Sequence, residues 1–222
     1  MNRQEKWDYQ TALAWLDELG EAQVKPGLAR IRALMAALGA PQAQMRAVIV
    51  GGTNGKGSTC WLLEDALCRA GLRVGCATSP HLHNVRERLR LDRAPVSEAE
   101  FGALAAEVRQ ACDGLAEHPS YFEVLTAITL AWFARREADI AVLEVGLGGE
   151  LDAMNVVDAE VAVLTTLALE HTDWLGPDLE AIARTKAGIV RPGAQVVTGW
   201  PQAYHQFIPP CASLASGDSA RE

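Results

Sequence analysis

The stretch Val50-Gly51-Gly52-Thr53-Asn54-Gly55-Lys56-Gly57-Ser58-Thr59 decides how the rest of this 222-residue chain is interpreted. It follows an apolar run at 47–50 and precedes a helical pattern over 58–70, so it is a glycine-rich turn between a strand and a helix. Glycines let the backbone N–H groups of such a turn converge on phosphate oxygens, and the helix N-terminus adds its dipole. We therefore predict a phosphate-binding loop whose contacts come from Thr53, Asn54, Gly55, Lys56, Gly57 and Ser58.

The loop departs at two positions from the pattern G-x-x-x-x-G-K-[ST]. Val50 stands where the first glycine is expected, and Gly57 follows Lys56 where a hydroxyl residue is expected. An ordinary glycine-rich turn is the alternative interpretation. We favour the phosphate loop because a lysine, its flanking glycines and Ser58 coincide between a strand and a helix.

The segments around the loop predict an α/β fold. Strand patterns occur at 47–50, 73–77, 88–91, 140–145, 161–167 and 195–197, and helical patterns at 9–19, 27–38, 58–70, 97–115, 122–136 and 178–187. The strand segments are apolar throughout, which is typical of a mostly parallel sheet with helices on both faces. We expect one domain over residues 1–199.

The chain beyond residue 199 lacks a periodic pattern, so we expect a disordered tail at 200–222. Such a tail would leave the strand at 195–197 as an open sheet edge. Apolar side chains near this edge, such as Val163, Val196 and Val197, would then be exposed. Exposed apolar faces and unpaired edges favour association, so we predict self-association or a partner chain at this edge.

Composition narrows the class of function. The net charge of −8 argues against a nucleic-acid or membrane-surface partner, because both favour a basic surface. The five cysteines are widely spaced and form no C-x-x-C motif, so neither a disulfide framework nor a zinc site is expected. No apolar leader or membrane-length run is present. We expect a cytoplasmic protein that binds small molecules.

Further motifs resemble the Mur-ligase-like family, and within it the folylpolyglutamate and dihydrofolate synthases. They share order and spacing with that family over roughly residues 27–193. The motifs are Thr78-Ser79-Pro80-His81-Leu82, Tyr121-Phe122-Glu123, Leu143-Glu144-Val145-Gly146-Leu147-Gly148-Gly149 with Leu151-Asp152-Ala153, and His171-Thr172-Asp173-Trp174-Leu175-Gly176 followed by Lys186-Ala187-Gly188-Ile189.

The resemblance implies a Mur-ligase-type central domain that uses ATP and Mg²⁺ to join L-glutamate to dihydropteroate or a folate through an acyl phosphate. It implies catalytic roles for Lys56, His171 and a carbamylated Lys186. It also implies magnesium ligands at Ser79, Glu144 and His171, and substrate contacts at Gly27, Tyr121, Phe122, Glu123, Leu151, Asp152 and Ala153. The position of Glu144 at the end of an apolar strand supports the implied metal role independently, because a buried carboxylate is costly unless it is paired or bound to metal.

Simpler roles stay open for several of these residues. Ser79 could cap a turn before Pro80, and His171 could be a hydrogen-bonded loop histidine. Lys186 could be a solvated cation at a helix end. Phe122 and Leu151 could belong to the core.

Some features depart from the family pattern. Glu150 stands where the family typically has arginine, Met154 replaces a threonine, and Glu170 replaces an aspartate. A carboxylate at 150 is expected to weaken binding of an anionic substrate. Family members are about twice as long, so the domain is expected to be incomplete at its C-terminus. The alternatives are a non-catalytic nucleotide- or folate-binding remnant, half of a split ligase, or a Mur-like ligase for another carboxylate.

Overall fold

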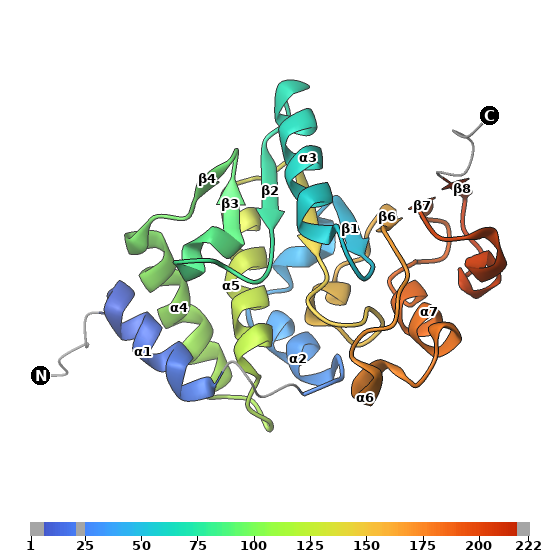
Figure 1. The fold of residues 1–222 in the computed structure, drawn as a ribbon. Coiled ribbons are helices and arrows are strands. Elements are labelled where there is room, and N and C mark those ends of the chain that lie inside the picture. Colours follow the sequence, from blue (N-terminus) through green and yellow to red (C-terminus); the bar gives the residue numbers. More distant parts are fainter. Residues whose placement is uncertain (1–6, 21–24, 217–222) are drawn as a thin grey trace, which may run out of the picture.

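The computed structural model describes residues 7–20 and 25–216, and within them the strands form one eight-stranded sheet (Figure 1). The strand order is β4-β3-β2-β5-β1-β6-β7-β8. The antiparallel edge consists of β3 (Leu89–Leu91) and β4 (Ala94–Pro95). The parallel strands are β1 (Ala47–Gly51), β2 (Val74–Ala77), β5 (Ile140–Glu144), β6 (Val161–Leu164), β7 (Gln195–Thr198) and β8 (Ser213–Ser216). The predicted mostly parallel α/β fold is confirmed.

Helices cover both faces of this sheet. Successive side chains of a strand point to opposite faces, so the apolar strands contribute to a core on each side. In β1, Val48 and Val50 join the smaller core beneath α3 (Lys56–Arg69). Ile49 faces the larger core, which is built with the other long helices. These are α1 (Tyr9–Leu19), α2 (Ala29–Ala37), α4 (Glu98–Cys112), α5 (Tyr121–Arg135) and α7 (Leu179–Ala187).

Shorter helical turns lie mostly in the connections, where the sequence predicted irregular structure. They are η1 (Pro41–Gln44), η2 (Val85–Arg88), η3 (Ala153–Val156), α6 (Thr172–Leu175) and η4 (Gln202–Phe207). Within the described ranges, none of the helices has the length and apolarity needed to cross a membrane.

The prediction of a disordered tail is wrong for residues 200–216. Trp200 is 1% exposed, and Tyr204 and Phe207 of η4 also pack against the core. The following β8 pairs with β7 in parallel register. These few apolar residues are too irregularly spaced to give a periodic pattern, so only the tertiary contacts reveal their role. Residues 217–222 of the predicted tail lie outside the described residues.

Within the described residues, the edge of the sheet on this side is therefore β8 and not the segment at 195–197. Val197 is nevertheless 47% exposed, and Val163, its register partner, is half-buried. Val196 is buried, contrary to the prediction, because it points to the opposite face and joins the larger core. Association through this region stays a prediction.

Candidate nucleotide and substrate site

The predicted phosphate loop connects the end of β1 to the start of α3. Gly55 adopts a left-handed conformation (φ 83°) as the N-cap of α3, which a glycine allows without strain. The first intrahelical bond runs from Thr59 N to Gly55 O (2.9 Å). The N–H groups of residues 55–58 have no acceptor inside the helix. They are the donors that a phosphate at this helix N-terminus would use.

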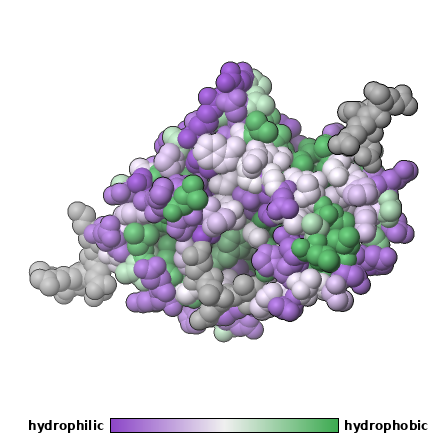
Figure 2. Space-filling model, in the orientation of Figure 1, coloured by the Kyte–Doolittle hydropathy of each residue, from purple (hydrophilic) through white to green (hydrophobic). Residues whose placement is uncertain are grey.

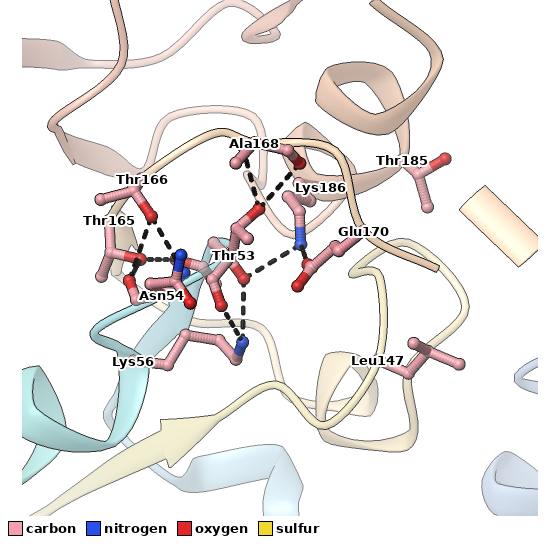
Figure 3. A network of polar contacts seen from close by, with 12 residues as sticks. Thr53, Asn54, Lys56, Leu147, Thr165, Thr166, Ala168, Glu170, Thr185 and Lys186 are labelled. Atoms are coloured by element: carbon pink, nitrogen blue, oxygen red, sulfur yellow. Dashed lines mark hydrogen bonds and ion pairs between the residues drawn. The ribbon is translucent and has the colours of Figure 1, made fainter. Parts of the chain in front are cut away.

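Earlier in the loop, the backbone is bound by the segment that follows β6 (Figure 3). Thr53 N donates to Thr166 O (2.8 Å), and Asn54 N donates to Thr166 Oγ1 (2.9 Å). The Thr53 hydroxyl also bonds to the backbone of Ala168. The N–H groups of Thr53 and Asn54 are therefore used to hold the loop in place. Those of residues 55–58 have no acceptor within α3 and stay available for a ligand.

The two lysines predicted to be catalytic converge on one carbonyl (Figure 3). Lys56 Nζ donates to Gly52 O (2.9 Å) and Thr53 O (3.0 Å). Lys186 Nζ donates to the same Gly52 O (3.0 Å) and pairs with Glu170 (2.5 Å). Burial lowers the pKa of Lys186, while the Glu170 carboxylate opposes this shift. Because Lys186 is only 1% exposed, the alternative of a solvated helix-end cation is wrong.

Glu144 and Ser79 meet beside the first turn of α3. Glu144 ends β5, and its carboxylate accepts a hydrogen bond from Ser79 N (2.9 Å). A Cβ on Gly57 would lie 3.5 Å from a Glu144 oxygen, so the carboxylate lies against the helix. Burial raises the pKa of Glu144, and the Ser79 N–H and the charges of Lys56 and Arg90 oppose this.

The predicted magnesium ligands fit the ion in part. Carboxylate and hydroxyl oxygens, as in Glu144 and Ser79, are hard donors of the kind Mg²⁺ prefers. His171 is exposed at the start of α6, with a left-handed backbone (φ 45°). Among the described residues, no three His, Cys, Asp or Glu side chains form a metal-binding group. Magnesium at Ser79, Glu144 and His171 stays a prediction.

A pocket of about 330 Å³ opens next to Ser79. Figure 2 shows the surface hollowed between the part that carries α5 and the part that carries α6. All seven residues predicted to contact the substrate line this pocket: Gly27, Tyr121, Phe122, Glu123, Leu151, Asp152 and Ala153. The structure therefore brings together three segments that are far apart in sequence, and the role of each residue toward a substrate stays a prediction.

Two buried carboxylates organise the pocket wall. Asp152 accepts hydrogen bonds from Gly146 N (3.0 Å), Leu147 N (2.9 Å) and Met154 N (2.9 Å). Burial raises the pKa of Asp152 to about 6, although these N–H groups oppose the shift. Because one carboxyl group holds three backbone amides, it shapes the whole turn between β5 and η3.

Glu123 performs a similar task at the start of α5. One of its oxygens accepts from Ser120 N (2.7 Å) and from Arg30 Nε (3.1 Å), and the other is buried without a partner in the described structure. Sequence reasoning missed Arg30, which lies 93 residues away in the chain. It also missed the capping box formed by Ser120 and Glu123, although its S-x-x-E spacing was readable.

Glu150 does not line the pocket, so the expected like-charge contact with a substrate is not supported. A Cβ on Gly188 would lie 2.4 Å from the Cβ of Glu150, which places this residue against α7. Met154 is 6% exposed and belongs to the larger core. Phe122 packs over Gly146 at the pocket wall, where a Cβ on that glycine would meet the ring at 2.7 Å.

Comparison with known proteins assigns the family. The Mur ligase middle domain model matches residues 50–196, which include the phosphate loop, Glu144 and Lys186. The chain belongs to the Mur ligase family. This Mur ligase chain is 43% identical over 190 residues to the Escherichia coli dihydrofolate synthase/folylpolyglutamate synthase, covering 86% of this chain and 44% of the relative. It is 38% identical over 199 residues to the Bacillus subtilis protein of the same name, covering 87% of this chain and 46% of that relative.

Solved structures agree with this placement of the Mur ligase chain. It superposes on E. coli FolC in complex with DHPP and ADP with a TM-score of 0.86 and 39% identity, covering 94% of this chain and 51% of the other. Its comparison with the FPGS-AMPPCP-folate complex gives a TM-score of 0.87 and 34% sequence identity, covering 94% of this chain and 54% of the other. The chain spans about half the length of these relatives. The resemblance to folylpolyglutamate and dihydrofolate synthases is confirmed.

Proposed function

We propose that this chain is the nucleotide-binding part of a ligase that uses ATP to join L-glutamate to the carboxylate of dihydropteroate or a folate. One observation carries the proposal. Ser79 lines the pocket and also donates its N–H to Glu144 beside the phosphate loop, so the two halves of the site share a wall. Two similar structures support the ligand classes, since one holds DHPP and ADP and another holds AMPPCP and folate.

The residues suggest how the reaction would proceed. The N–H groups of residues 55–58 would bind the nucleotide phosphates, and Lys56 would leave the carbonyls of Gly52 and Thr53 to contact them. A substrate carboxylate at the Ser79 end of the pocket would take the γ-phosphoryl group and release ADP. The glutamate amine would then form the amide bond as phosphate leaves. Bound Mg²⁺, held by Glu144 and Ser79, would supply neutralisation of phosphate charge.

The first test is calorimetric titration with Mg-AMPPCP, a nucleotide that does not transfer its phosphoryl group. Lys56→Ala should weaken binding about tenfold or more, because a charge-assisted hydrogen bond contributes roughly 1.5–3 kcal/mol. Arg69→Ala removes a cation from the far, exposed end of the same helix and should change the affinity by less than about twofold. Equal affinities for wild type and Lys56→Ala would contradict the proposal.

Turnover separates the proposal from its main alternative. A reaction with dihydropteroate, glutamate and ATP tests whether this chain by itself completes the ligation, in which case phosphate release would require all three. Glutamate-dependent phosphate release would exclude the alternative of a non-catalytic binding chain.

A further inference from the structure

We propose that Thr165 and Thr166 are positioning residues for the phosphate loop. Their hydroxyl groups hold the Asn54 peptide in the arrangement that presents the N–H groups of residues 55–58 to a nucleotide. The inference rests on the proposed nucleotide site, and it adds two residues that act through the loop.

Both backbone polar groups of Asn54 are bound by these hydroxyls (Figure 3). Thr166 Oγ1 accepts from Asn54 N (2.9 Å) and lies 3.2 Å from Asn54 O. Thr165 Oγ1 donates to Asn54 O (2.8 Å). These bonds join residues that are 111 and 112 positions apart in the chain. The shape of the loop therefore depends on a tertiary contact as well as on its own glycines.

Thr165 also fits closely against the start of the loop. Its hydroxyl lies 3.2 Å from Gly51 O, and a Cβ built on Gly52 would lie 2.0 Å from the same Oγ1. Thr165 N donates to Gly51 O (2.9 Å), which extends the pairing of β1 with β6. The hydroxyl thus occupies the space that a side chain at Gly52 would need.

The segment that carries both threonines is itself anchored. Gly199 N donates to Leu164 O (2.9 Å), and a Cβ on Gly199 would lie 2.4 Å from Thr165 O. The end of β7 therefore supports the two threonines from the side away from β1. A fixed support matters because donors that bind phosphate must converge on one point, and displacements near 1 Å already weaken such sites.

The geometry separates loop positioning from overall stability. Asn54 and Thr166 are exposed, so water can replace their hydrogen bonds in a variant without leaving buried polar groups unpaired. Thr166→Val keeps the shape of the side chain and removes its hydroxyl. The loop should lose its preset conformation while the fold remains.

The experiment combines amide exchange at Asn54, followed by NMR, with titration of Mg-AMPPCP. Thr166→Val and Thr165→Val should each weaken nucleotide affinity by roughly three- to tenfold, the range expected for one or two neutral hydrogen bonds. Exchange at Asn54 should become faster by a similar factor or more in Thr166→Val. Thr166→Ser, which retains the hydroxyl, should restore both values.

Thr129→Val is the matched control. Its hydroxyl donates to Leu125 O (2.7 Å) within α5, so this variant loses a buried hydroxyl without touching the loop. It should bind nucleotide and exchange at Asn54 as the wild type does. Any general effect of destabilisation would appear in this control.

Two outcomes would overturn the inference. One is wild-type exchange and affinity in both valine variants, and the other is faster exchange at Asn54 with unchanged nucleotide affinity. If wild type and variants alike fail to bind nucleotide, the proposed function is contradicted. The exchange comparison then decides alone whether the threonines hold the loop.

Discussion

The phosphate loop and the adjoining pocket reach their shapes by different means. The loop is one contiguous stretch, whose backbone is held by the hydroxyls of Thr165 and Thr166, by Lys186 and by its own Lys56. The pocket collects residues from three distant segments, and buried carboxylates at Asp152 and Glu123 hold backbone amides in its wall. The loop could be predicted from its own strand–turn–helix pattern. The pocket residues were predicted only through motifs shared with the family, and their meeting in space follows only from the fold.

The largest expected effect is that of Gly52→Ala in the loop. This glycine has a φ of +136°, and a Cβ there would lie 2.0 Å from Thr165 Oγ1. We expect the free energy of unfolding to fall by about 2–4 kcal/mol, with loss of Mg-AMPPCP binding and little change in dihydropteroate affinity. Urea denaturation and calorimetry measure these quantities.

Gly193→Ala is the control for this variant. Gly193 also has a positive φ (+80°), but no atom lies within 4 Å of the place its Cβ would take. It should cost only about 1 kcal/mol, the strain of the backbone alone. Equal costs at the two glycines would show that Thr165 does not restrict the loop.

Next in size is the pH effect expected from Asp152 in the pocket wall. The pKa of Asp152 rises from 3.8 to about 6 on folding, so the folded chain binds this proton more tightly than the unfolded chain. The resulting stability is full below about pH 4 and is lost as the pH rises through about 6, with a total of the order of 3 kcal/mol. The phosphate loop contains no carboxylate of its own, but burial also raises the pKa of Glu144 beside it, so a variant at Asp152 is needed to isolate the pocket's contribution.

Unfolding free energies of wild type and Asp152→Asn, measured from pH 4 to 7, test this expectation. The advantage of wild type over the variant should shrink as the pH rises. An advantage that stays constant or grows with pH would mean that Asp152 is ionised at little cost, stabilised by its three backbone donors.

Gly146→Ala is the pocket's counterpart of the change at Gly52. Its Cβ would lie 2.7 Å from the tip of the Phe122 ring, which must move away. Overpacking of this kind costs about 1–3 kcal/mol, so dihydropteroate affinity should fall several-fold. Nucleotide affinity should stay within about twofold of wild type if the two regions are independent. A parallel loss of both ligands would show that they are coupled.

The smallest effect is expected for Glu150→Arg. This residue lies outside the pocket lining, against Gly188, so its charge reaches a bound anion only through screened solvent. Dihydropteroate affinity should change by less than about twofold. Several-fold tighter binding would restore the contact expected from the family pattern.

The sequence predicted the parts of the molecule that depend on local pattern. The phosphate loop, the central strands and α1 with its bounds at Tyr9 and Leu19 all follow from apolar spacing and glycines. The ordered segment around Trp200 could not be predicted, since it owes its structure to packing on the core. The same holds for Arg30 beside Glu123 and for the threonines that hold Asn54, because contacts across about a hundred residues leave no local signal.

We propose that one wall, at Ser79 and Glu144, joins a nucleotide site to a substrate pocket. A crystal structure with Mg-AMPPCP and dihydropteroate measures this most directly, through the distance from the γ-phosphorus to the nearest substrate carboxylate oxygen. We expect these two atoms to approach to a reactive distance of roughly 3–4 Å. A carboxylate that points away from the loop, or a nucleotide bound elsewhere than at residues 55–58, would contradict it.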